Sequence, residues 1–347
     1  MMHLKLIWIL AAVNVPLSLQ LQSVQDLANG ISNNFLEWLA SIFLPINTTT
    51  ARPVTNNSKP TTPSTTTTKR TTTAIAINLD PTERECSVCL CGLINTLRIV
   101  GGQETRRHQY PWVAVVLLNS RFYCSGSLIN DLYVLTAAHC VKGVPVELIE
   151  VRLLEHSRSQ KDAFVVRRFA SHVKTHEFYS PVSFDNDIAL IRLDRPVPVD
   201  GTLRPICMPV PGYSFEGELG IVTGWGVQAE GGLASDTLRE VSVVIITQAE
   251  CRNSSYSESE ITDNMICAGD LAEGGKDACT GDSGSPLHVP FEEEPGQYQL
   301  AGIVSWGDGC ARPNTPGVYT RVNRYLRWIG ANIHGACLCT PYPEEDL

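Results

Sequence analysis

Three short segments, far apart along the chain, carry the residue types that an acyl-transfer site needs. They are Leu135–Cys140 (LTAAHC), Asp185–Leu190 (DNDIAL) and Gly281–Pro286 (GDSGSP). Ser283 could act as a nucleophile, His139 as the base that removes its proton, and Asp187 as the carboxylate that holds the base. A lone serine or histidine is more often structural, but all three in this order predict one catalytic site, which only the fold can assemble.

The composition indicates a globular protein with a non-globular stem. The chain has 347 residues, 43% of them hydrophobic, which is enough for one large or two modest cores. The net charge is −9, and the sequence contains no run of Lys or Arg. We therefore expect neither a nucleic acid nor an acidic membrane surface as a partner.

The N-terminal residues 1–19 are typical of a secretory signal peptide. Their apolar run, Leu6–Val13, is too short to cross a hydrocarbon core of about 30 Å, so we expect no membrane span. No clear small-x-small cleavage site follows, which leaves an uncleaved signal anchor as the alternative. Twelve cysteines agree with export to an oxidising exterior, so we expect a secreted, extracellular protein.

Two stem segments follow the signal. In residues 20–46 the apolar side chains recur at steps of three and four, which predicts a short amphipathic helix: Leu27, Ile31, Phe35, Trp38 and Ile42. This helix either packs within the protein or binds a partner or membrane surface. Residues 47–80 are rich in Thr and Pro and predict a disordered spacer, either O-glycosylated or unmodified. Asn47 and Asn56, like Asn253 further on, lie in N-glycosylation sequons.

The remainder of the chain indicates an all-β fold. Short alternating apolar runs are separated by turns rich in Gly, Pro and Asn: Val113–Leu117, Phe164–Val166, Val241–Ile245 and Leu300–Val304. Only Tyr325–Ile333 has clear helical spacing.

Together with Arg98–Gly102 (RIVGG), the three segments resemble the trypsin/chymotrypsin family of serine proteases, from Ile99 to about Ile333. The resemblance implies two six-stranded antiparallel barrels, an active site in the cleft between them and a C-terminal helix. It divides the rest of the chain into an activation segment (81–98), a protease domain (99–334) and a cysteine-containing tail (335–347). It also implies an oxyanion hole formed by the backbone N–H groups of Gly281 and Ser283.

The same resemblance implies cleavage after Arg or Lys. Asp277 would lie at the base of the primary pocket, where a carboxylate selects a cation. Ala278 removes a hydroxyl often present there, which favours Arg over Lys. Gly307 and Gly317 would admit a long side chain, and Phe184 would favour a small neighbouring residue. The residues expected to bind substrate are Asp277, Ala278, Ser305, Trp306, Gly307, Gly317 and Phe184, with Ser305–Gly307 pairing as an added strand.

Arg98–Ile99 is itself a trypsin-like cleavage site. The resemblance implies that a cut there frees the Ile99 amino group to pair with Asp282 and order the site. The chain would then be a zymogen that requires an upstream activating protease.

The cysteines can be assigned in part. The resemblance pairs Cys124 with Cys140, Cys251 with Cys267, and Cys279 with Cys310. Cys207 then needs a partner before the cut, for which Cys91 is our choice, so that the stem stays attached. Cys86 and Cys89 match Cys337 and Cys339, with the pairing left open and zinc binding as the alternative.

No metal or other cofactor is expected. Glu155 resembles the start of the family's calcium loop, but a matching second Glu is not evident, so calcium is doubtful. Pro316 argues against sodium activation, and Ser285 should be tolerated in place of the family's usual glycine. The remaining histidines have no companion at ligand spacing and are predicted at the surface: His108, His156, His172, His176, His288 and His334.

The sequence thus predicts a secreted trypsin-like serine endopeptidase in a regulated cascade, because a digestive enzyme has little use for a spacer that survives activation. Its partners would be proteins with exposed Arg or Lys, an activating protease and protein inhibitors. One alternative is a catalytically silent homologue that serves as a binding module. Another is an adhesion or matrix protein in which the stem matters more than the enzyme.

Overall fold

The computed structural model describes residues 86, 88–95, 104–199, 201–227, 231–275, 277–292, 294 and 296–341. The expected signal peptide, amphipathic helix and Thr-rich spacer lie outside these residues, as do Asn47, Asn56, Arg98 and Ile99.

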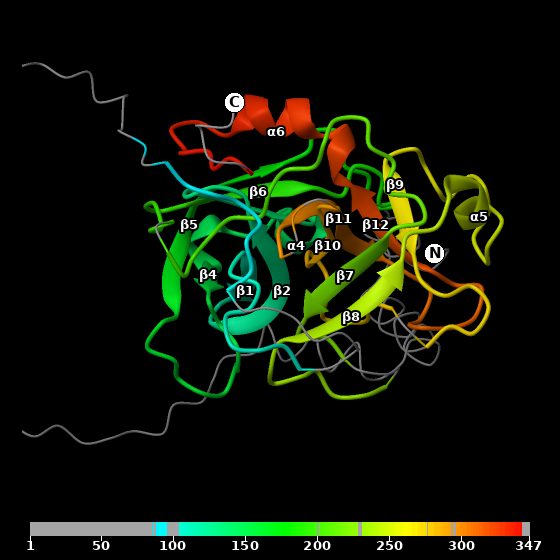
Figure 1. The fold of residues 1–347 in the computed structure, drawn as a ribbon, viewed down its shortest axis with the longest axis horizontal. Helices are drawn as coiled ribbons and strands as arrows, with labels where there is room; N and C mark the ends of the chain where they lie inside the picture. The colour runs from blue at the N-terminus through cyan, green and yellow to red at the C-terminus, as the bar shows by residue number, and fades with distance from the viewer. Residues whose placement is uncertain are drawn as a thin grey trace, which may run out of the picture. The chain divides into compact units, whose positions relative to one another are not determined.

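The first six strands form a closed antiparallel barrel in the order β1-β2-β3-β6-β5-β4 (Figure 1). They are β1 (Val113–Leu118), β2 (Arg121–Leu128), β3 (Tyr133–Thr136), β4 (Ile149–Leu153), β5 (Val166–Thr175) and β6 (Ala189–Leu193). Every residue of β1 is apolar and buried, which requires that both faces of this strand are covered, and its backbone pairs with both β2 and β4. The strand expected at Phe164–Val166 begins only at Val166.

The next six strands form a second antiparallel sheet in the order β8-β7-β10-β11-β12-β9. They are β7 (Leu219–Gly224), β8 (Arg239–Val244), β9 (Met265–Ala268), β10 (Pro286–Pro290), β11 (Tyr298–Trp306) and β12 (Gly317–Arg321). Its two edge strands meet through a bridge between Ile245 and Ala268, and the Ile246 N–H donates to the Cys267 carbonyl at 3.0 Å. The all-β prediction of two six-stranded barrels is confirmed.

The described residues contain few helices. These are α4 (Ala138–Val141), α5 (Gln248–Arg252) and α6 (Leu326–Asn332), with single 3₁₀ turns η1 (Val146–Leu148) and η2 (Val322–Arg324). The predicted C-terminal helix is α6. In the part of the chain that the structure describes, no helix has the length and apolar content needed to cross a bilayer.

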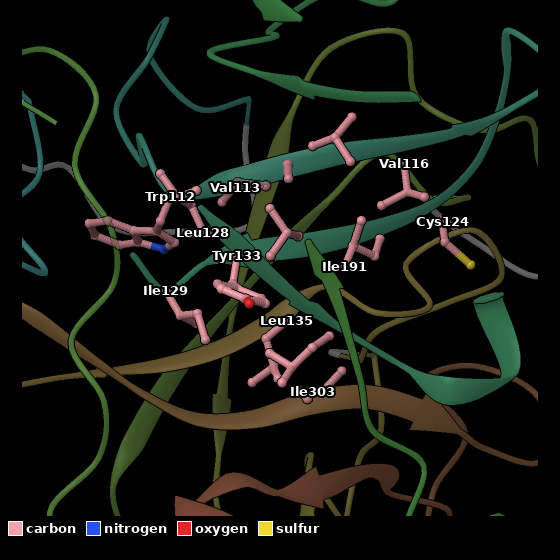
Figure 2. Close-up of a cluster of buried hydrophobic side chains, with 14 of the residues drawn as sticks. Trp112, Val113, Val116, Cys124, Leu128, Ile129, Tyr133, Leu135, Ile191 and Ile303 are labelled. Carbon is pink, nitrogen blue, oxygen red and sulfur yellow. The ribbon is translucent and has the colours of Figure 1, made fainter. Parts of the chain in front are cut away.

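The larger hydrophobic core extends from the first barrel into the second sheet. Figure 2 shows Leu135 of β3 and Ile303 of β11 in one cluster, and both side chains are fully buried. Because apolar contacts join the two sheets, each sheet supports the loops that the other presents at their junction.

The segment that contains Cys86 and Cys89 is joined to the C-terminal part of the chain by disulfides. The disulfides are Cys86–Cys337, Cys89–Cys339, Cys91–Cys207, Cys124–Cys140, Cys251–Cys267 and Cys279–Cys310. The first two join this segment to the tail, where the Cys91 N–H donates to the Thr340 carbonyl and the Thr340 N–H to the Cys89 carbonyl, both at 3.0 Å. The segment is therefore held by covalent bonds and by paired backbone.

Two of the histidines predicted at the surface are buried, so that prediction was wrong for them. His156 is 5% exposed and pairs with Glu104, whereas His288 on β10 is 0% exposed among aromatic rings. His172 and His334 are exposed as expected. Tertiary contacts bury the side chains of His156 and His288, and ligand spacing in the sequence contains no signal for such contacts.

Candidate active site

Strand pairing brings His139 and Asp187 together. His139 lies on α4, which follows β3, and Asp187 lies two residues before the start of β6. β3 and β6 are antiparallel neighbours, with Thr136 opposite Ala189. Two segments that are distant in sequence therefore end at the same edge of the first barrel.

The Asp187 carboxylate is completely buried, and both of its oxygens have hydrogen-bond partners. Its Oδ2 lies 2.8 Å from His139 Nδ1 and accepts the Ser305 hydroxyl at 2.6 Å, while its Oδ1 accepts the His139 backbone N–H at 2.9 Å. The Thr320 hydroxyl donates to the Asp187 carbonyl at 2.7 Å. Ser305 and Thr320 belong to β11 and β12, so the second sheet also fixes this aspartate.

Ser283 lies in the turn before β10, where the two barrels touch. The Ser125 N–H of β2 donates to the Ser283 carbonyl at 2.8 Å, and the Gly284 N–H donates to the Val304 carbonyl at 2.9 Å. Gly284 has a φ of 81°, and a Cβ there would overlap the Ser125 carbonyl oxygen. Glycine is thus required for the turn to approach the first barrel.

The nucleophile and base are not yet joined by a hydrogen bond. His139 Nε2, the atom that would take the proton, lies 3.6 Å from Cys140 Sγ, and within the described residues it forms no hydrogen bond with Ser283 Oγ. Catalytic hydrogen bonds are often long before substrate binds.

The backbone at Gly281 and Ser283 has two N–H groups that could bind a substrate oxygen. Gly281 has a φ of 97°, a left-handed conformation that favours glycine. Neither its N–H nor that of Ser283 donates to an acceptor among the described residues. Both donors therefore remain available for a substrate oxygen.

Asp277 has one carboxylate oxygen that could pair with a cation. Its Oδ2 accepts the Ala311 N–H at 3.2 Å, while the buried Oδ1 has no hydrogen-bond partner in the described part of the chain. Burial raises the pKa of Asp277 to about 7. A Cβ on Gly317 would collide with Oδ1, so glycine keeps that oxygen accessible. The cost of an unpaired buried carboxylate falls when a guanidinium or ammonium enters.

Some of the other residues expected to bind substrate can be placed by their contacts or by their position in the chain. Ala278 follows Asp277, and Trp306 and Gly307 continue β11 beyond Ser305, with the Trp306 ring 4.9 Å from that of Tyr256. The Phe184 ring lies edge-on to His139, with centroids 5.9 Å apart. Sequence reasoning placed Ser305 in the substrate strand but missed its hydroxyl bond to Asp187, and it missed Thr320 altogether. No local motif marks either role.

Asp282 has backbone partners but no cationic partner among the described residues. Its Oδ1 accepts the Gly226 N–H at 2.8 Å and its Oδ2 the Cys279 N–H at 3.0 Å. Desolvation raises the pKa of Asp282 to about 6. Gly226 must be glycine because a Cβ would lie 2.5 Å from Asp282 Oδ2.

The possible metal ligands near the site are already engaged. Cys124, His139 and Cys140 form the one such group among the described residues, but the two cysteines are joined in a disulfide, which leaves no thiolate ligand. Glu155, at the expected start of a calcium loop, lies 3.5 Å from the Arg152 guanidinium.

Comparison with known proteins agrees with this geometry. Residues 99–329 match the family model described as Trypsin. The chain belongs to the trypsin family of serine proteases. This trypsin-family endopeptidase is 40% identical to trypsin-1 of Astacus astacus over 67% of this chain and 99% of that protein. It is 36% identical to the proclotting enzyme of Tachypleus tridentatus, over 70% of this chain and 69% of the relative. It is also 37% identical to vitamin K-dependent protein C of Mus musculus, over 68% and 52% of the two chains.

Proposed function

We propose that this protease is secreted as a zymogen, is activated by cleavage after Arg98, and hydrolyses peptide bonds after Arg, and less readily after Lys. The observation that carries the specificity is the Asp277 carboxylate, whose Oδ1 is unpaired and faces Gly317. Ala278 removes a hydroxyl that would help to solvate the compact Lys ammonium, which favours Arg.

The proposed mechanism assigns one task to each group. Ser283 Oγ attacks the carbonyl carbon while His139 Nε2 takes its proton, and the developing oxyanion is bound by the N–H groups of Gly281 and Ser283. His139 then protonates the departing amine, which leaves an acyl-enzyme on Ser283. Water, deprotonated by His139, attacks the ester and regenerates the serine. Asp187 keeps the Nδ1 proton in place and stabilises the imidazolium.

Activation would add one ion pair. The freed amino group of Ile99 would meet Asp282, which forms no ion pair within the described residues. Neutralising this carboxylate would stabilise the turn that carries Gly281 and Ser283. No cofactor is included in the proposal, and calcium remains doubtful because Glu155 already has a cationic neighbour.

The proposed setting is a regulated extracellular cascade. The similarity to a proclotting enzyme supports it, and so do the disulfides that would retain the stem after activation. The partners would be proteins with exposed Arg or Lys, an activating protease and protein inhibitors.

A peptide library tests the proposal. Refolded, oxidised protein cut after Arg98 should hydrolyse peptides after Arg, with Lys second, whereas Ser283→Ala should be inert. Preference for Leu or Phe would overturn the assignment of Asp277. A correctly cut enzyme that leaves arginyl amides and esters intact would overturn the catalytic proposal.

A further inference from the structure

A second pocket, of about 240 Å³, lies on the first barrel and borders the oxyanion-hole loop. It is lined by Val115, Leu117, Ser120, Phe122, Arg152, Glu155 and Arg158. Phe122 places this pocket beside Gly281, because a Cβ built on Gly281 would lie 3.8 Å from Phe122 Cε1. One edge of this ring therefore faces the backbone that would bind the reacting oxygen.

Arg158 supplies a positive charge to this pocket and forms no ion pair with a described residue. Its guanidinium lies over the Phe122 ring, 4.7 Å from the centroid. Its Nε donates to the Ser235 carbonyl at 2.9 Å and one terminal nitrogen donates to the Ala234 carbonyl at 3.3 Å. No carboxylate of the described residues lies within ion-pair distance of it. The guanidinium is thus fixed in direction and still able to pair with an anion.

Asp236, on the neighbouring loop, interacts electrostatically with Arg158 but forms its hydrogen bonds with other groups. Asp236 accepts the hydroxyl groups of Ser157 and Ser159 at 2.7 and 2.9 Å, and the Ser159 N–H at 2.9 Å. These bonds hold its carboxylate away from Arg158, and hydrogen bonding lowers the pKa of Asp236.

The other charged residues of the pocket compensate one another. Arg152 Nε donates to Glu150 at 2.7 Å, and a terminal nitrogen lies 3.5 Å from Glu155. The apolar wall comes from Val115 and Leu117 of β1 and from Phe122. The pocket therefore combines an apolar wall with one cation that forms no ion pair with a described residue and interacts with Asp236 only at longer range. This lining matches a side chain with a short apolar stem and a terminal carboxylate.

We propose that this pocket binds an acidic side chain of the substrate, Glu in preference to Asp, on the leaving-group side of the scissile bond. The leaving-group side is inferred from which sheet supplies each group. Asp277 and Ser305–Gly307, which belong to the second sheet and its loops, would hold the acyl side. Phe122 of β2 faces Gly281, and Arg158, in the loop after β4, lies over the Phe122 ring. The inference rests on the proposed proteolytic function.

A positional scan tests the proposal. Peptides with Arg at the cut and Glu, Gln or Lys at each of the first four leaving-group positions are assayed with the activated full chain. We expect the ratio of kcat/KM for Glu over Gln to reach about 5 at one position and to fall towards 1 in 1 M salt. Arg158→Glu should invert the preference at that position, so that Lys exceeds Glu. Arg327→Gln, which removes an exposed arginine from α6, should leave the ratio unchanged.

Each outcome has a defined consequence. Because each ratio is measured within one variant, partial loss of folded enzyme does not alter it. A Glu-to-Gln ratio near 1 at all four positions, with the Gln peptides still cleaved after Arg, would overturn this subsite and leave the proposed function intact. An unchanged preference in Arg158→Glu would do the same. Failure to cleave any Arg peptide would overturn both proposals.

Discussion

Asp187 binds His139 at two points, through the ring nitrogen Nδ1 at 2.8 Å and through the backbone N–H at 2.9 Å. The first contact places the proton on Nδ1 and leaves Nε2 free to accept one, and the second fixes the start of α4. Ser305 holds the same carboxylate from the other sheet at 2.6 Å. The orientation of the base therefore depends on both sheets.

Asp187→Asn should lower kcat on arginyl substrates by a factor on the order of 10⁴, because the amide cannot accept at both contacts and favours the wrong imidazole tautomer. Active-site titration and steady-state kinetics measure the loss. Asp194→Asn, at an exposed aspartate just after β6, is the matched control and should remain active. A loss below tenfold for Asp187→Asn would contradict the assigned role.

Gly317→Ala should lower kcat/KM for arginyl substrates by about 10²-fold, because the new methyl group would occupy the space beside Asp277 Oδ1 and displace the guanidinium. Gly330→Ala on α6 is the control, since a Cβ there meets nothing within 4 Å. Equal effects of the two substitutions would show that Gly317 does not border the specificity pocket.

The affinity for benzamidine should weaken as the pH falls below about 7. Burial raises the pKa of Asp277 to about 7 in the empty pocket, so the carboxyl is protonated below that pH and cannot pair with the amidine cation. The Kd should rise roughly tenfold per pH unit once the carboxyl is mostly protonated. Fluorescence competition at pH 8, 6.5 and 5.5 measures this, and Asp277→Asn should bind weakly with little pH dependence. A flat profile in the unmodified enzyme would contradict the prediction.

The stem segment should remain attached after activation even when its expected disulfide is removed. In the double variant Cys91→Ala, Cys207→Ala, the bonds Cys86–Cys337 and Cys89–Cys339 still join the segment to the tail. A cut after Arg98 should therefore release no fragment on a non-reducing gel, and reduction should release it. Release without reductant would show that these two bonds do not form.

The catalytic motifs and these cysteines show how much of the structure can be predicted from the sequence. The motif around each catalytic residue located His139, Asp187 and Ser283, because the chemistry of a nucleophile and its base restricts the residues beside them. The partners of Cys86 and Cys89 could not be predicted from the sequence. They depend on the backbone hydrogen bonds of Cys89 and Cys91 with Thr340, which is remote in sequence.

Tertiary contacts outside the motifs were the harder part to predict. The bond from Ser305 to Asp187 joins β11 of the second sheet to the loop before β6 of the first barrel, and a single sequence contains no signal for such a contact. The second pocket likewise depends on Arg158 meeting Phe122, which lie on different elements. Burial of His288 also depends on tertiary contacts, because Leu287 and Val289 face the core of the second sheet while His288 is covered on the other face by Tyr110 and Trp112.

His288 is the most unusual titratable group of the core. Its ring centroid lies 4.8 Å from Tyr110, 5.5 Å from Trp112 and 5.1 Å from Tyr298, and neither ring nitrogen has a hydrogen-bond partner among the described residues. Burial lowers the pKa of His288 from its usual 6.5 to about 3. The imidazole therefore stays neutral inside the folded protein over the whole range in which an unfolded chain would protonate it.

This difference makes stability depend on pH with a defined sign. Between pH 6.5 and 3 the unfolded chain binds a proton at His288 that the folded chain does not, so the contribution is complete above pH 6.5 and is lost as the pH falls. At pH 5 the loss relative to pH 7 is about 2 kcal/mol, at 1.36 kcal/mol per unit. Urea unfolding of the Ser283→Ala zymogen, disulfides intact, should show that His288→Leu removes this part of the pH dependence. Leu300→Val, opposite His288 on β11, should lower stability equally at both pH values. An identical pH dependence with and without His288 would mean that the ring is hydrated or protonated in the folded protein.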